Sequence, residues 1–157
     1  MLIVDDEPLV RDVLARVLAD HHDVTTADSG LAALDVMSTM TFDVIVCDVM
    51  MPGMTGCDLH EKLLRVAPDQ ARRMIFVTGG ATTAEARAFV ETVPNPVLGK
   101  PFEVEALREL IERQIREHGP APEERASSRE PRTASIHYQT SPNDLAGLDA
   151  ARRREQG

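Results

Sequence analysis

The stretch CDVMMPG, residues 47–53, follows directly on the β-rich run FDVIV and places a carboxylate, Asp48, where that run stops. A single acidic residue after a strand usually starts a turn, because Asp hydrogen-bonds its own backbone and tolerates turn geometry. A chemical role for Asp48 therefore requires other polar groups at the same place. The organisation of the remaining chain tests whether it has them.

Short β-rich runs alternate with helical patterns through the first 116 residues. Several of these runs, such as LIV, VIV and IFV, are apolar on successive residues, which is typical of strands covered on both faces. The alternation predicts βαβ units, and hence an α/β fold with a doubly wound, five-stranded parallel sheet and five helices. We expect strands over residues 1–4, 23–27, 42–47, 74–78 and 97–99, and helices over 8–18, 29–40, 58–67, 83–92 and 103–116.

The length of 157 residues and the hydrophobic fraction of 43% suit one domain with an extension. We place the domain at residues 1–117. Residues 118–157 are rich in Pro, Ser and charge, so we expect a disordered tail with a possible short helix over 142–154.

Composition excludes several classes of function. The net charge of −9 argues against direct nucleic-acid binding, which needs a basic face. No window resembles a membrane span or a secretory signal, so we expect a cytoplasmic protein without direct membrane contact. Cys47 and Cys57 lack the spacing of a zinc site or a disulfide framework, and we interpret them as reduced packing residues.

Polar residues stand where the predicted strands end. The first strand is followed by Asp5 and Asp6, the third by Asp48, the fourth ends in Thr78 and the fifth precedes Lys100. The carboxyl ends of strands in such a sheet meet at one crevice, where ligands bind. Two carboxylates ~4 Å apart repel by about 4 kcal/mol at an effective dielectric of 20, so crowded acids favour a bound cation. Mg²⁺ prefers oxygen ligands of this kind, and it is usually bound by one or two carboxylates together with phosphate oxygens. The acidic cluster therefore predicts phosphate chemistry.

An Asp carboxylate can act as a nucleophile and form an aspartyl-phosphate. Such a transfer depends mainly on positioning and on neutralising the phosphoryl oxygens. We therefore expect Asp48 to attack, Lys100 and Mg²⁺ to hold phosphoryl oxygens, and Thr78 to bond the third.

The segments VDDEP (4–8), DVMMPGMTG (48–56), VTGG (77–80) and KPF (100–102) together resemble the receiver domain of two-component response regulators, over about residues 1–116. The resemblance implies a flavodoxin-like sheet of strand order 2-1-3-4-5 and a phosphoryl group accepted from a phosphohistidine. It also implies self-phosphorylation and slow autodephosphorylation, with no foreign substrate. The implied roles are Asp48 as phosphoacceptor, Asp6 as direct Mg²⁺ ligand, Asp5 as ligand through water, Met50 as ligand through its carbonyl, Thr78 as switch hydroxyl, and Lys100 with a cis bond to Pro101.

Residues 76–102 are similar to receivers fused to hybrid sensor kinases. This likeness implies a sensor histidine kinase or a histidine phosphotransfer protein as partner, and the face of helix 4, strand 5 and helix 5 as switching face and possible homodimer contact. Val97 stands where the family usually has an aromatic residue, which puts that part of the switch in question. A docking patch beside the site is predicted from Pro8, Leu9, Arg11, Pro101 and Phe102, although Leu9 could equally cover the core.

Two other functions remain open. A phosphorylation-independent interaction module could keep the fold without the chemistry, and a Mg²⁺-dependent phosphatase would also use acids at strand ends. Met50 occupies the position where dehalogenase-like phosphatases need a second Asp, and no GxxxxGK[ST] loop exists. His60 faintly resembles a phosphoacceptor histidine, but we expect it to be a solvated surface residue.

Overall fold

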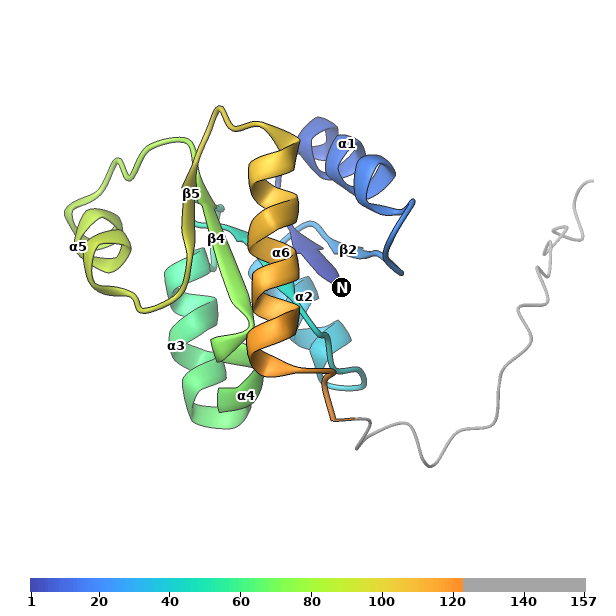
Figure 1. Ribbon diagram of the computed structural model, residues 1–157. Coiled ribbons are helices and arrows are strands. Elements are labelled where there is room, and N and C mark those ends of the chain that lie inside the picture. Colours follow the sequence, from blue (N-terminus) through green and yellow to red (C-terminus); the bar gives the residue numbers. More distant parts are fainter. Residues whose placement is uncertain (123–157) are drawn as a thin grey trace, which may run out of the picture. The chain divides into compact units, whose positions relative to one another are not determined.

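The computed structural model describes residues 1–122, which form a five-stranded parallel sheet flanked by helices (Figure 1). The strand order β2-β1-β3-β4-β5 confirms the predicted doubly wound fold. The elements are β1 (Leu2–Val4), α1 (Pro8–Leu18), β2 (Thr25–Ala27), α2 (Gly30–Met37), β3 (Ile45–Asp48), α3 (Gly56–Val66), α4 (Pro68–Arg72), β4 (Met74–Thr78), α5 (Ala84–Thr92), β5 (Val97–Gly99) and α6 (Val104–His118).

The sheet has an apolar layer on each face, as the continuous apolar strand runs predict. Alternate residues of β1 point to opposite sides: Leu2 packs with α2 and α3, whereas Ile3 packs with α1 and α6. The first layer also includes α4 and α5, so four helices cover one face and two cover the other. The three central strands, β1, β3 and β4, are therefore buried on both faces.

Side-chain caps explain where several helices begin. The Ser29 hydroxyl accepts the Ala32 N–H before α2, and the Thr83 hydroxyl accepts the Ala86 N–H before α5. In α3, Thr55 and Asp58 form a reciprocal capping box. These caps fix the loops that run from the carboxyl ends of the strands into the helices.

The strand register brings the predicted site residues to one edge of the sheet. Val4 pairs with Cys47, Asp48 with Val77, and Thr78 with Gly99. Because these strands are parallel, the residues that follow them emerge on the same side of the domain.

The prediction of five helices was wrong by one, because residues 68–72 form the additional short helix α4. Pro68 occupies its first turn, which suits a ring that fixes φ and lacks an N–H. Five residues are too few to show a helical period, so the sequence pattern gave no signal. The face predicted from helix 4, strand 5 and helix 5 therefore corresponds to α5, β5 and α6.

The expectation of a solvated His60 was also wrong. Its side chain is 6% exposed and makes edge contacts with the rings of Phe76 and Phe89, at centroid distances of 5.4 and 5.6 Å. Leu59 and Leu63 on the same helix are buried too. His60 therefore belongs to the packing between α3, β4 and α5.

Helix α6 extends to His118, and residues 119–122 are hydrogen-bonded to the domain, although the sequence assigns residues from 118 onward to the tail. The remaining tail, 123–157, and the helix expected over 142–154 lie outside the described residues. Within residues 1–122, no helix is long and apolar enough to cross a membrane. Cys47 and Cys57 are both free thiols, as predicted.

Gly56 allows α3 to start directly against the end of β3. A methyl group at this position would overlap the Asp48 carbonyl oxygen and lie 3.0 Å from the Val49 Cα, and backbone atoms cannot swing aside. We predict that Gly56→Ala lowers the free energy of unfolding by about 1–3 kcal/mol, measured by urea denaturation. The control Gly99→Ala meets no atom within 4 Å and should change stability by less than about 0.5 kcal/mol. Equal stability of the two variants would contradict the packing argument.

Buried His60 should make stability depend on pH. Burial lowers the pKa of His60 below its ordinary value of 6.5, and a hydrogen bond with Asn95 offsets this in part. The unfolded chain then binds a proton more readily, so this contribution to stability is complete above pH 6.5 and is lost as pH falls toward the lower folded value. We predict that His60→Phe, which preserves edge packing, flattens the curve of unfolding free energy against pH in this window. Exposed His21→Gln is the control; curves for wild type and His60→Phe that run parallel would refute the prediction.

Candidate functional site

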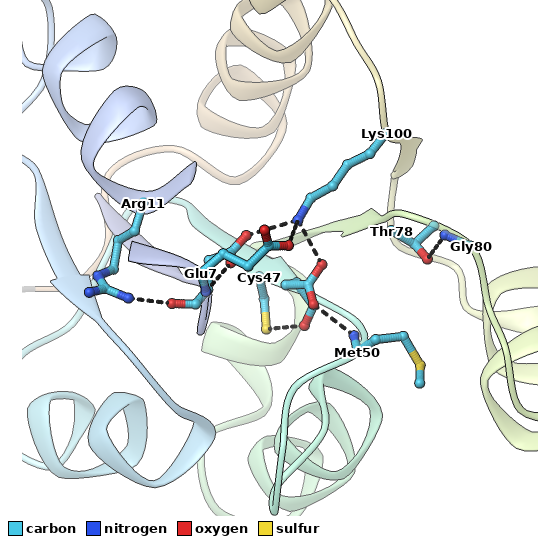
Figure 2. Close-up of polar contacts among 9 residues, drawn as sticks. Glu7, Arg11, Cys47, Met50, Thr78, Gly80 and Lys100 are labelled. Atoms are coloured by element: carbon cyan, nitrogen blue, oxygen red, sulfur yellow. Dashed lines mark hydrogen bonds and ion pairs between the residues drawn. The ribbon is translucent and has the colours of Figure 1, made fainter. Parts of the chain in front are cut away.

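The centre of the site is an ammonium group between two buried carboxylates. Lys100 Nζ lies 3.0 Å from Oδ2 of Asp5 and 3.1 Å from Oδ1 of Asp48. Asp5 and Asp48 are only 3% and 6% exposed. Figure 2 shows the extended Lys100 side chain, with dashed lines from its nitrogen to carboxylate oxygens. Three of the predicted site residues are thus brought together.

Backbone groups hold both carboxylates in place. The second oxygen of Asp5 accepts the Glu7 N–H at 2.8 Å, and the second oxygen of Asp48 accepts the Met50 N–H at 2.9 Å. Each acid therefore has one fixed backbone donor and shares one mobile cation. Asp48 is the last residue of β3, so its backbone is also fixed by the sheet.

The cluster changes the proton affinities of its members. Burial raises the pKa of the Asp48 carboxyl; the charge and hydrogen bond of Lys100 oppose this rise, and the charge of Asp5 adds to it. Burial lowers the pKa of Lys100, but the hydrogen bond to Asp5 and the charge of Asp48 outweigh it, so that the pKa lies above its ordinary value. The lysine therefore stays charged at neutral pH, and the acids gain a permanent counter-ion.

Thr78 lies at the end of β4 and is 8% exposed. Its hydroxyl accepts the Gly80 N–H at 3.2 Å. Figure 2 shows that this hydroxyl points toward Gly80 and away from Lys100. The backbone carbonyl of Thr78 accepts the Lys100 N–H at 2.7 Å. Thr78 is thus beside the site, linked to Lys100 by its main chain and not by its hydroxyl.

Asp6 is half-buried, and within residues 1–122 its side chain makes no hydrogen bond or ion pair with the cluster. Met50 contributes its N–H to Asp48, whereas the sequence assigned a role to its carbonyl. The Lys100–Pro101 bond is cis, as the resemblance implies.

Two contacts were not assigned from the sequence. Glu7 Oε1 lies 4.0 Å from Lys100 Nζ, and Arg11 donates from Nη1 to the Asp5 carbonyl at 2.8 Å. The position of Glu7, two residues after a strand end, was the available signal. Arg11 was predicted on the docking patch, but its guanidinium turns to the loop that carries Asp5.

The donor chemistry fits a hard divalent ion in part. Mg²⁺ takes one or two carboxylates and keeps several waters, and Asp5 and Asp48 are two carboxylates already close enough to share one cation. In the described part of the chain, no three His, Cys, Asp or Glu side chains are grouped closely enough to hold a metal ion by themselves. Asp6 is thus not yet part of the cluster.

An apolar groove adjoins the site. Its volume is about 320 Å³, and it runs between α1 and the segment after β5. Leu9 is 77% exposed, which rules out the alternative that it covers the core. The groove is lined by Leu9, Val10, Val13, Leu14, Lys100, Pro101, Phe102 and Val104.

Comparisons with known proteins show which proteins this chain is similar to. The chain is similar to the sensory transduction protein LytT of Enterococcus faecalis, with 33% identity over 142 residues that cover 88% of this chain and 57% of LytT. It is also similar to the protein-glutamate methylesterase/protein-glutamine glutaminase of Escherichia coli K12, with 32% identity over 123 residues, 74% of this chain and 35% of that protein. The chain therefore spans less than two thirds of either relative.

The fold is similar to that of the response regulator protein TrrA of Thermotoga maritima, whose structure is a complex with Mg²⁺ and BeF. The TM-score is 0.62 at 24% identity, covering 72% of this chain and 96% of TrrA. Residues 1–112 match the family described as the response regulator receiver domain. The chain therefore belongs to the family of response regulator receiver domains of two-component systems.

Proposed function

We propose that this domain accepts a phosphoryl group from a phosphohistidine onto Asp48. Receiver domains receive phosphoryl groups from histidine kinases and in general bind Mg²⁺. The observation that carries the proposal is the contact of Lys100 Nζ with both Asp48 and Asp5 at about 3 Å. The ammonium opposes the rise in the Asp48 pKa that burial causes and places a cation beside the carboxylate, and an attack on phosphorus needs an anionic oxygen with a cation nearby.

In the reaction, an oxygen of the Asp48 carboxylate forms a bond to phosphorus, and the bond between phosphorus and the donor imidazole nitrogen breaks. The Met50 N–H keeps the carboxylate oriented through its other oxygen. Lys100 then shifts its hydrogen bonds from the carboxylates to the phosphoryl oxygens. A phosphoryl group brings a charge of about −1.5 to −2, which the ammonium attracts.

We propose that Mg²⁺ is held by Asp5, Asp6 and Asp48 with the backbone carbonyl of Met50. When bound, the ion neutralises phosphoryl oxygens and offsets the repulsion of the acids. Asp5 and Asp48 are prepared for this role by their burial and shared cation. Asp6 is half-buried and follows Asp5 directly in the chain, and we propose that its side chain turns toward the ion when the ion binds.

Thr78 is proposed as the switch residue. Among residues 1–122 its hydroxyl makes one hydrogen bond, accepted from the Gly80 N–H, so its own proton is available for a phosphoryl oxygen. A move toward Asp48 would pull on the loop that leads into α5. Phosphorylation would then shift the population of α5 positions and change the face formed by α5, β5 and α6.

The groove of α1 supports a helical partner. Its exposed Leu9 and Val13 are one turn apart, and Lys100 lies in both the groove and the site. A helix packed there would bring a phosphohistidine next to Asp48. We therefore propose that the donor is a helix of a sensor histidine kinase or phosphotransfer protein, including the hybrid kinase class.

A second groove, of about 540 Å³, lies on β5 and α6. Its apolar floor of Val97, Leu98 and Leu110 is bordered by acidic Glu109 and Glu112 and basic Arg113 and Arg116. Both signs of charge on one patch suit contact with a second copy, so we propose this face for homodimerisation.

We predict that a small phosphodonor such as acetyl phosphate, with Mg²⁺, adds one phosphoryl group to the wild-type chain and none to Asp48→Asn. Intact mass spectrometry measures the product. Exposed Asp35→Asn on α2 is the matched control and should label like wild type. Labelling that persists in Asp48→Asn would refute the assignment. Turnover of a foreign phosphoester would favour a phosphatase, and partner binding independent of both donor and Asp48 would favour a simple interaction module.

We predict that Asp6→Asn weakens Mg²⁺ binding roughly tenfold, about 1.4 kcal/mol, measured by calorimetric titration. The reason is the loss of one anionic oxygen ligand. Asp12→Asn, an exposed change on α1, should leave the affinity as in wild type. An unchanged affinity in Asp6→Asn would contradict its role as ligand while leaving the role of Asp48 intact.

A further inference from the structure

Arg73 is a buried cation at the end of the sheet away from Asp48. It follows α4 directly, precedes β4 and is 5% exposed. Its guanidinium donates to main-chain carbonyls at the end of α6: Gly119 at 2.7 Å, His118 at 3.1 Å and, at longer range, Pro120 at 3.5 Å. Among residues 1–122 it makes no ion pair with an acid.

A guanidinium removed from water is costly unless its donors are satisfied. Here the carbonyls at the end of α6, where the helix dipole is negative, supply the acceptors. Arg73 therefore recognises the main-chain carbonyl groups at the C-terminal end of a helix. Gly119, with φ of 65°, turns the chain so that these carbonyls face Arg73.

Two further side chains hold the residues that follow. Asp43 Oδ1 accepts the Ala121 N–H at 2.6 Å, and the Thr41 hydroxyl donates to the Pro122 carbonyl at 3.0 Å. Every residue from 118 to 122 thus has a hydrogen bond to one of three side chains, although only the first is helical. A helix cap alone would account for the Arg73 contacts but not for those of Asp43 and Thr41.

We propose that Thr41, Asp43 and Arg73 form an intramolecular binding site for residues 118–122, which fixes where the chain leaves the receiver domain. Thr41 and Asp43 precede β3, and Arg73 precedes β4. These are the strands whose opposite ends carry Asp48 and Thr78. The site therefore holds residues 118–122 at the ends of β3 and β4 opposite to Asp48 and Thr78. In Figure 1 the C-terminal end of α6 lies at the bottom of the domain, whereas α1 lies at the top.

The site has ligand chemistry of its own. The Arg73 guanidinium donates to two or three carbonyls, the Asp43 carboxylate accepts an N–H, and the Thr41 hydroxyl donates to a carbonyl. All of these partners are main-chain groups, so the site recognises the backbone of the segment and not particular side chains. Pro120 and Pro122 have no N–H to satisfy, which suits a segment held chiefly through its carbonyls. The proposal does not depend on phosphorylation.

The test is amide hydrogen exchange by NMR on the full chain, with the Gly119 and Ala121 N–H groups as reporters. Arg73→Leu should speed exchange at both at least ~tenfold, a loss of about 1.4 kcal/mol. Arg72→Leu is the matched control, since Arg72 is the exposed neighbour paired with Asp69. The double variant Thr41→Val/Asp43→Ala should release Ala121 while leaving Gly119, whose N–H bonds to the Ile115 carbonyl, protected.

Amides of β4, such as that of Phe76, report general loosening. The proposal is overturned if Ala121 exchanges alike in wild type and the double variant, if Arg73→Leu matches Arg72→Leu, or if Phe76 is released as much as Ala121. If Arg73→Leu does not fold, the double variant alone decides the outcome, because Thr41 and Asp43 are half-buried and lie outside the fully buried core. Labelling of Asp48 is expected to stay at the wild-type level in the double variant.

Discussion

The rest of the site depends on one ammonium nitrogen, that of Lys100, held between Asp5 and Asp48. Two carboxylates buried side by side without a cation would repel each other and lose hydration, and burial of unpaired charge is among the most costly changes a domain can undergo. The sheet supplies the solution, because β1, β3 and β5 end at the same edge. Two carboxylates and the ammonium group that they share are thereby placed together by strand geometry.

Much of this arrangement could be predicted from sequence, and the physical reason is the parallel sheet. The three central strands are buried on both faces and need consecutive apolar residues, so their runs were recognisable in the sequence, and the polar residues that follow these runs lie at the strand ends. Which strand lies beside which is a different matter. Periodicity does not contain that information, and the order of strands came from the resemblance carried by the motifs around Asp5, Asp48 and Lys100.

The structure differs from the sequence-based expectations at positions where contacts between distant parts of the chain determine the conformation. Helix α4 has only five residues, too few for a period. His60 lies beside Leu59 and one turn before Leu63, so helical spacing placed it on the buried side of α3. The expectation of a solvated residue rested on residue type, because most histidines lie at the surface. The Thr78 hydroxyl accepts the Gly80 N–H, and within residues 1–122 the Asp6 side chain makes no hydrogen bond or ion pair with Asp5, Asp48 or Lys100, so neither side chain belongs to the cluster. Arg73 gave no signal at all, since its partners are main-chain carbonyls about 45 residues later.

Of the six described helices, α5 has the fewest fully buried residues, with Ala86 alone, while Phe89 leans on Phe76 and His60 at ring edges. Local displacement of an element costs free energy in proportion to the apolar surface it uncovers. The element of this domain that costs least to displace is consequently α5, which is joined through five loop residues to the end of β4 beside the acids. A displacement of Thr78 can therefore move α5 while uncovering little buried surface. The same displacement of α1 or α6 would expose more buried residues of the core.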